Sequence, residues 1–133
     1  MQKLSLIVIL LTLFAFTGKK QSSSLKGIWE YRGGKFNNKL SAAPKGYSQQ
    51  RKYTDAKFDA FLYEPGQPTV KYESGDYTLA ADSCLETQTF CLQDQSMVGK
   101  TVHYHYAVRN DTLILNGTLP NGAVIEDYWK KVK

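Results

Sequence analysis

Arg51 and Glu86 are the charged residues whose positions in the sequence most clearly suggest chemistry. Alternation of polar and apolar residues places Arg51 on the apolar face of a strand pair over 49–62, and Glu86 on the same face as Phe90. A charge on an apolar face is costly unless it is paired. With Tyr53 beside it, Arg51 could bind the anionic head group of a ligand, because a guanidinium attracts a carboxylate strongly away from water. The alternative is a structural ion pair between Arg51 and Glu86, which needs no ligand.

His103 and His105 are two residues apart on one predicted strand, so both imidazoles lie on the same side. That spacing permits a metal site in principle. The sequence offers no evident third ligand, and alternation places both histidines opposite Tyr104 and Tyr106, on the outer face. We therefore expect solvated histidines and no bound metal.

Cys84 and Cys91 lie in one predicted strand. Their separation of seven residues is roughly 23 Å in an extended chain, whereas a disulfide needs Cα atoms about 5.5 Å apart. We expect two buried free thiols, with an intermolecular disulfide or metal binding as the alternatives.

Known catalytic patterns are absent from the sequence. It has no Gly-rich phosphate loop, no nucleophile elbow and no histidine beside a plausible Ser or Cys nucleophile. We predict that the protein is not an enzyme and needs no cofactor.

The elements that must position these residues are short alternating strands, which run from residue 27 to residue 132. In the clearest hairpin, over 101–117, Asn110-Asp111 forms a two-residue turn that pairs Tyr106 with Leu115 and Val108 with Leu113. In the hairpin over 49–62, a turn at Asp55-Ala56 pairs Tyr53 with Phe58 and Arg51 with Ala60.

Three further segments are predicted less directly. The stretches 69–72 and 76–80 are expected as separate short pairings, and 83–92 as one strand with Cys84, Glu86, Gln88, Phe90 and Leu92 on one face. Residues 38–46 could form a helical turn or a lid.

The last turn, at Pro120-Asn121-Gly122, has two solutions. A two-residue loop brings Tyr128 and Glu126 to the inner face, whereas a three-residue loop with Gly122 left-handed brings Trp129, Asp127 and Ile125 there. The strand count of roughly eight to ten predicts an all-β fold, a single antiparallel up-and-down β-barrel, although a β-sandwich fits the same periodicity.

The first 18 residues predict an export signal. A basic start is followed by an uncharged run, Leu4 to Phe16, which is too short to cross the roughly 30 Å hydrocarbon core as a helix. We expect residues 1–18 to be a cleaved signal peptide, 19–26 a polar leader and 27–133 the barrel domain. Cleavage would remove one lysine and reduce the net charge from +5 to +4. This charge is scattered, which disfavours nucleic-acid binding.

Six short motifs follow one another through the mature chain: Gly27-Ile28-Trp29, Asp55-Ala56-Lys57-Phe58, Gly75-Asp76-Tyr77-Thr78-Leu79 with Glu86 following, Asn110-Asp111-Thr112-Leu113, Gly117-Thr118-Leu119-Pro120-Asn121-Gly122, and Glu126-Asp127-Tyr128-Trp129-Lys130-Lys131-Val132. This ordered set resembles the lipocalin and fatty-acid-binding superfamily, the calycins, and in particular the small secreted lipocalin-like domain proteins of Gram-negative bacteria. The resemblance implies a closed barrel that is exported to the periplasm or the extracellular space.

The resemblance also implies roles for individual residues. Trp29 would plug the barrel floor, with Lys130 or Lys131 stacked on it. The positions that hold an Arg and a Tyr for the ligand carboxylate in fatty-acid-binding proteins are here Asp127 and Trp129. Simple fatty-acid carriage is therefore not expected. Some calycins isomerise or cyclise their ligands, which is the enzymatic alternative.

Taken together, the sequence predicts an exported, monomeric barrel that has no membrane span in the mature protein. We expect this barrel to be non-enzymatic and to hold a small, mostly apolar or amphipathic molecule. The alternative is a structural or protein-interaction module whose barrel is filled by its own side chains. The residues expected to line the interior are Trp29, Arg51, Tyr53, Phe58, Tyr77, Glu86, Tyr104, Tyr106 and Trp129.

Overall fold

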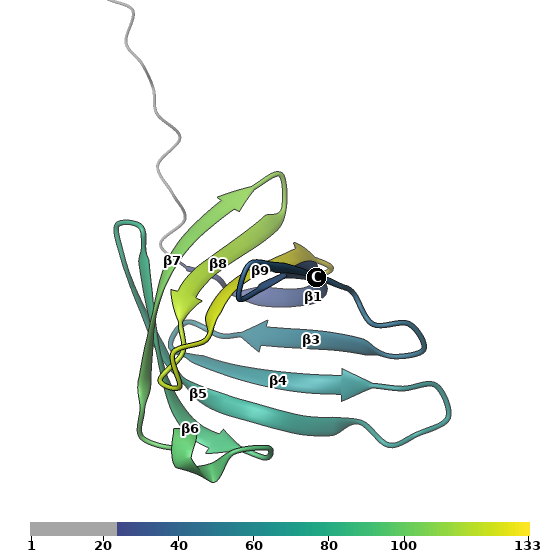
Figure 1. The fold of residues 1–133 in the computed structure, drawn as a ribbon. Helices are drawn as coiled ribbons and strands as arrows, with labels where there is room; N and C mark the ends of the chain where they lie inside the picture. Colours follow the sequence, from purple (N-terminus) through teal and green to yellow (C-terminus); the bar gives the residue numbers. More distant parts are fainter. Residues whose placement is uncertain (1–23) are drawn as a thin grey trace, which may run out of the picture.

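The computed structural model describes residues 24–133, which form one antiparallel sheet closed into a barrel (Figure 1). The predicted signal peptide lies outside the described residues. The elements in chain order are β1 Gly27–Phe36, β2 Lys39–Ala42, β3 Ser48–Tyr53, β4 Lys57–Tyr63, β5 Val70–Ala80, β6 Ser83–Cys91, the 3-10 helix η1 Gln95–Met97, β7 Thr101–Arg109, β8 Thr112–Thr118 and β9 Val124–Lys131.

Closure depends on β1, which pairs with β3 on one side and with β9 on the other. Trp29 lies opposite both Arg51 of β3 and Lys131 of β9. The remaining strands pair in chain order, and β2 is an additional strand that pairs with the second half of β1. The up-and-down barrel predicted from the sequence is therefore confirmed, and the β-sandwich is excluded.

The seam between β1 and β9 requires a glycine at position 34. A Cβ atom there would lie 2.0 Å from the Glu126 carbonyl oxygen, far inside van der Waals contact. The register of the seam also shifts between Tyr31 and Gly33, which makes Arg32 the extra residue of a β-bulge. This bulge and the close approach explain why two consecutive glycines interrupt the pattern of β1.

The predicted hairpin registers are confirmed. Arg51 pairs with Ala60, and Tyr106 pairs with Leu115. Both turn residues of the β7–β8 hairpin, Asn110 and Asp111, have positive φ, as the tight turn requires.

The last turn takes the three-residue solution. Gly122 has a φ of +87°, and the Leu119 amide donates a hydrogen bond to the Ala123 carbonyl oxygen. As a result, Trp129 pairs with Leu113 and Asp127 pairs with Leu115. Trp129 and Asp127 therefore belong to the inner face.

Two expectations, that β5 would be two strands and that residues 38–46 would form a helical turn, were wrong. Residues 70–80 form one strand instead of two, because bulges absorb the irregular residues. Residues 38–46 contain strand β2 and no helical turn; the short helix instead follows β6, at Gln95–Met97.

The expectation that Phe90 and Leu92 face the interior was also wrong. Gln88 pairs with Gly75 whereas Phe90 pairs with Ser74, so Thr89 is an extra residue and the alternation reverses after Gln88. Phe90 is 37% exposed and Leu92 is 55% exposed.

The core fills one end of the barrel with twelve buried side chains: Leu25, Trp29, Tyr53, Phe58, Tyr77, Cys84, Val102, Tyr104, Tyr106, Leu113, Leu115 and Trp129. Leu25 precedes β1 and is fully buried. Packing against the core thus includes a residue that lies two positions before the first strand. None of the helices in residues 24–133 has the length and apolar character needed to cross a membrane.

Candidate functional site

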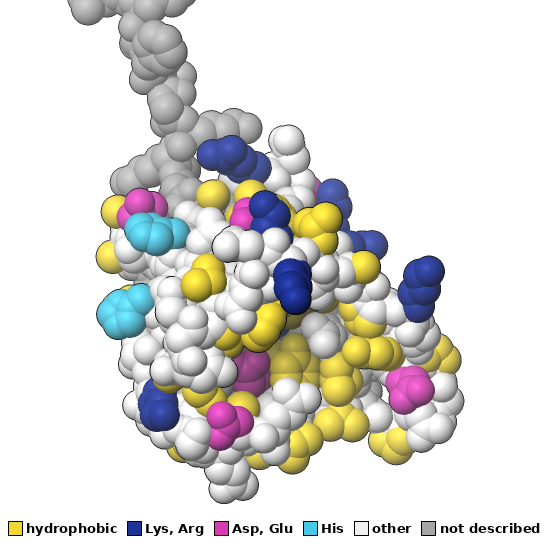
Figure 2. Space-filling model, viewed as in Figure 1, with side chains coloured by type: hydrophobic (Ala, Val, Ile, Leu, Met, Phe, Trp, Pro, Cys, Tyr) yellow, Lys and Arg dark blue, Asp and Glu magenta, His cyan; other side chains and the backbone are white. Residues whose placement is uncertain are grey.

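A cavity of about 510 Å³ occupies the barrel interior beyond the packed core. Side chains from both ends of the chain line it, including Tyr31 of β1, Arg51 of β3, Glu73 of β5, Gln88 of β6 and Trp129 of β9. Figure 2 shows an acidic side chain among hydrophobic side chains where this face of the molecule is hollowed. The cavity is therefore mixed in character, with aromatic, acidic and amide groups in its wall.

Arg51 and Glu86 form an ion pair at the boundary between cavity and core. Arg51 Nη2 donates to Glu86 Oε1 at 2.5 Å, and the Tyr53 hydroxyl donates to Glu86 Oε2 at 2.6 Å. Both charged side chains are almost completely buried. The guanidinium also lies over the Phe58 ring, with its carbon 4.6 Å from the ring centroid. The structural ion pair foreseen from the sequence is thus present, and it satisfies the carboxylate of Glu86.

Burial and pairing act in opposite directions on the two charges. Burial works to lower the pKa of Arg51, but Glu86 together with Tyr53, Glu73 and Tyr104 outweighs it, and the pKa lies well above its ordinary value. Burial raises the pKa of Glu86, while Arg51 and the Tyr53 hydroxyl oppose the rise. The pair is therefore stable only as a unit, since either charge alone would be buried without compensation.

Among residues 24–133, three buried side-chain atoms lack a hydrogen-bond partner: Arg51 Nε, Gln88 Oε1 and Trp129 Nε1. All three residues line the cavity, and each side chain is at least nine-tenths buried. Buried polar atoms in proteins are nearly always hydrogen-bonded. Two donors and one acceptor are thus buried beside the cavity without a partner among the described residues.

Acidic side chains supply most of the remaining charge in the cavity wall. Glu73 accepts a hydrogen bond of 2.7 Å from Gln88 Nε2. Asp127 lies on the inner face of β9, where burial raises its pKa to about 6. The nearby carboxylates of Glu73 and Glu86 add to this rise, and Arg51 opposes it.

The nine predicted interior residues divide into two groups. Arg51, Tyr104 and Trp129 line the cavity. The other six, which are buried in the core without lining this cavity, are Trp29, Tyr53, Phe58, Tyr77, Glu86 and Tyr106. That these six residues take part in ligand binding stays a prediction. Since they do not line the cavity, they would act by holding the three lining residues in place.

Trp29 lies in the barrel floor. Its indole Nε1 donates to the Leu25 carbonyl oxygen at 2.8 Å, and Lys131 Nζ lies 5.6 Å from the ring centroid. Of the two lysines considered for this stacking, Lys131 is the one in place. The fully buried Leu25 and Trp29 close the barrel end opposite the cavity.

Most cavity residues were not among the predicted set; Tyr72, Glu73, Gln88 and Asp127 are polar examples. Gln88 shared the predicted face of Glu86, and Asp127 followed from the three-residue solution for the last turn, so a signal existed for both. Tyr72 and Glu73 are consecutive, which alternation would place on opposite sides. A register shift between Ala60 and Phe61 leaves Tyr72 as the extra residue of β5, and both side chains line the cavity.

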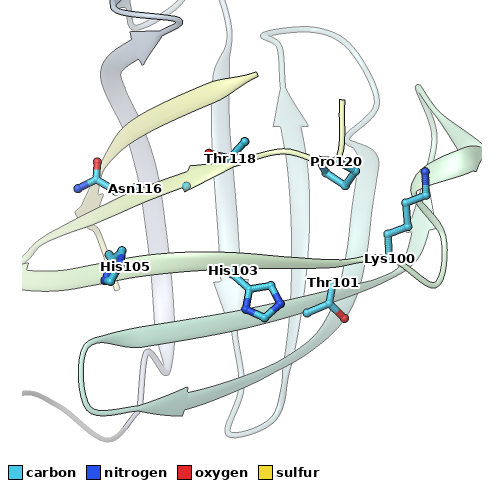
Figure 3. A pocket seen from close by; sticks show the side chains of 8 residues that line it. Lys100, Thr101, His103, His105, Asn116, Thr118 and Pro120 are labelled. Carbon is cyan, nitrogen blue, oxygen red and sulfur yellow. The ribbon is translucent and has the colours of Figure 1, made fainter. Parts of the chain in front are cut away.

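A second hollow, of about 600 Å³, lies on the outer face of β7 and β8 (Figure 3). His103 and His105 line it from β7, and both are exposed, as predicted. His105 Nδ1 is 3.7 Å from Asp82 Oδ2. Within residues 24–133 there is no cluster of three or more His, Cys, Asp or Glu side chains suited to a metal ion.

Both cysteines are free thiols. Cys84 is buried in the core, where burial raises its pKa to about 12. Cys91 is partly exposed and lines the cavity. The expectation that both are buried was therefore wrong for Cys91, which turns inward at the cavity mouth because of the bulge at Thr89.

The fold and the site define an antiparallel up-and-down barrel with an internal cavity at one end. No protein-family model matches the sequence, and no curated protein matches it. Among solved structures, the chain is similar to two mutant forms of the fluorescent protein UnaG, both at a TM-score of 0.40. Sequence identity is 11% and 12%, over 82% and 81% of this chain and 97% and 96% of those chains. A similarity at this level carries no conclusion about a ligand.

Proposed function

We propose that this protein is an exported, non-enzymatic barrel that binds a small amphipathic molecule, in the manner of the calycins that its sequence resembles. The observation that carries the proposal is the 510 Å³ cavity of the barrel, whose wall combines aromatic side chains such as Tyr104 and Trp129 with the polar side chains of Gln88 and Asp127. A barrel filled by its own side chains would leave no such space.

The bound molecule would lie in an open-mouthed cavity of the barrel. Tyr31, Tyr104 and Trp129 offer aromatic surface to its apolar part, and the Tyr31 and Trp129 ring centroids are 5.2 Å apart. Polar side chains of the wall, among them Glu73 and Asp127, would orient its head. Met97 of η1 and Phe36 of β1 lie at the edge of the cavity and would cover the molecule from outside.

Two neighbouring residues of β3 provide a matched test of the cavity. Gln49 lines it, whereas Gln50 points outward and donates to Glu30 Oε2. Nile red, a neutral apolar dye, should bind the wild-type protein and gain fluorescence. Gln49→Trp should weaken this binding at least about tenfold by filling the cavity, and Gln50→Trp should leave it unchanged. Equal loss in both variants, or no dye binding at all, would contradict the proposal.

Native mass spectrometry of protein purified from its own host would test the natural ligand and export together. We expect a co-purifying small molecule, and a polypeptide mass that corresponds to cleavage near residue 18. A full-length chain in the soluble cell interior would contradict export.

The second candidate function is a protein-interaction module. It is favoured by the β1–β2 hairpin, where Leu40 is 87% exposed and Phe36 is 51% exposed. Under this candidate, Leu40→Ser would abolish capture of a partner from the native host extract, and Gln49→Trp would have no effect on function.

A further inference from the structure

Arg51 contributes little net positive charge to the cavity, because Glu86 neutralises it. The Nη2–Oε1 contact of 2.5 Å joins two side chains that are almost completely buried, and the second Glu86 oxygen accepts from Tyr53. An anionic ligand approaching Arg51 would therefore meet an ion pair and a neighbouring carboxylate rather than a free cation.

The remaining charged groups in the cavity wall are acidic. They are Glu73, Asp94 and Asp127, from β5, the β6–η1 connection and β9. Arg51 is the basic residue of the wall, so with Glu86 behind it the balance around the cavity is clearly negative. This is unusual in a chain whose formal net charge is +5, since the basic residues gather elsewhere.

The acidic side chains are accompanied by a buried acceptor with no partner. Gln88 is 2% exposed; its Nε2 donates to Glu73 Oε1, and its Oε1 is unpaired. The hydrogen bond to Glu73 fixes the orientation of the amide. The carboxylates of Glu73 and Asp127 are acceptors in the cavity wall, so they favour a ligand group that donates several hydrogen bonds.

The charge of the wall also disfavours an anionic head group. A carboxylate in the cavity would be repelled by Glu73, Glu86 and Asp127, whereas a cation would be attracted by them. Aromatic faces of Tyr31, Tyr104 and Trp129 would also attract a cation.

From these observations, and given the proposed ligand-binding function, we infer that the cavity selects an organic cation, an amphipathic amine, and discriminates against anionic amphiphiles. The amine would lie among Glu73, Gln88 and Asp127. The apolar body would lie against the aromatic rings. Asp127 would be mostly ionised at pH 7.5, because its pKa is about 6 and Arg51 opposes the effect of Glu73 and Glu86.

Three probes with the same apolar chain test the inference directly. Decylamine, decanol and decanoate, each below its micelle-forming concentration, would be titrated at pH 7.5 while they displace Nile red. We expect decylamine to bind at least about tenfold more tightly than decanoate, a difference of about 1.4 kcal/mol. Tighter or equal binding of decanoate would overturn the inference while leaving the proposed ligand-binding function intact.

Charge-neutralising variants identify the side chains responsible. Asp127→Asn and Glu73→Gln should each reduce the preference for decylamine over decanoate several-fold. Asp76→Asn removes the same charge from the outer surface, where Asp76 pairs with Lys57, and should leave the preference unchanged. An equal change in all three variants would mean that the net charge of the protein, and not the cavity, produces the preference, which would overturn the inference.

Failure of all three probes to displace Nile red from a dye-binding protein would overturn the inference as well. An absence of Nile red binding would instead overturn the proposed function itself.

Discussion

Arg51 Nη2 and Glu86 Oε1 are 2.5 Å apart, although β3 and β6 are not neighbours in the sheet. The contact crosses the barrel interior and ties two separate parts of the wall together. Because both groups are buried, its energetic role differs from that of the exposed pair Lys57 and Asp76 on the outer surface.

Breaking the buried pair from one side should be strongly destabilising. Glu86→Gln removes the compensating charge and leaves the guanidinium of Arg51 buried, so we expect unfolding free energy to fall by about 3 to 5 kcal/mol. The double variant Arg51→Met with Glu86→Leu removes both charges and should recover most of that loss. Urea unfolding followed by tryptophan fluorescence measures both values.

The exposed pair serves as the control for this experiment. Asp76→Asn should change the unfolding free energy far less than Glu86→Gln does, because both partners of the exposed pair are solvated. If Glu86→Gln were as mild as this control, the ion pair would not be a structural element of the barrel.

The stability of the protein should carry a pH dependence from Asp127. Burial raises its pKa from 3.8 to about 6 in the folded state, so the folded chain binds a proton more readily than the unfolded chain between these values. This contribution makes the protein less stable as pH rises from about 4 to about 6.

Asp127→Asn should therefore be more stable than wild type at pH 7.5, by about 1 to 3 kcal/mol, and the advantage should disappear below pH 4. Urea unfolding at several pH values measures the difference; parallel curves for the two proteins would contradict the prediction.

The two thiols should differ sharply in reactivity. Cys91 is partly exposed at the cavity, whereas Cys84 is buried with a pKa of about 12, so its thiolate is scarce at neutral pH. A maleimide should modify one cysteine rapidly in the native protein, and peptide mapping should identify it as Cys91. Cys84 should react only after unfolding. A molecule bound in the cavity should slow modification of Cys91, and labelling of Cys84 first would contradict this arrangement.

Gly34 should be intolerant of any side chain. Its Cβ position lies 2.0 Å from the Glu126 carbonyl oxygen, so Gly34→Ala would force β1 and β9 apart. We expect a loss of more than about 3 kcal/mol in unfolding free energy, comparable to the larger effects of overpacking. Gly66→Ala is the control: the site has a positive φ but no atom within 4 Å, so it should cost only about 1 to 2 kcal/mol. Similar losses in both variants would contradict the close approach at the seam.

Much of the barrel follows from two-residue periodicity and turn chemistry. The pairings of Arg51 with Ala60 and of Tyr106 with Leu115 are set by local rules, because the turn fixes the register and alternation then fixes every side chain on the strand. The Arg51–Glu86 partnership could be foreseen for the same reason, since two buried opposite charges each need compensation.

The cavity itself was harder to predict. The bulge at Tyr72 places consecutive residues on the same side of β5, and the bulge at Thr89 reverses the alternation of β6. Neither bulge is marked in the sequence by a local signal such as Pro. Phe90 therefore faces outward, and Cys91 reaches the cavity. Whether Tyr104 lines a space or fills it depends on the curvature of the whole wall, which periodicity does not specify.

The ladder between β1 and β9 joins residues about as distant in sequence as the domain allows, with Trp29 opposite Lys131. Such contacts are the slowest to form, because the chain must lose the entropy of the entire intervening loop first. Until residue 131 has emerged during synthesis, β1 and β8 would each present an unpaired edge. Crowded refolding should therefore favour reciprocal strand exchange between molecules, in which β9 of one copy completes the wall of another.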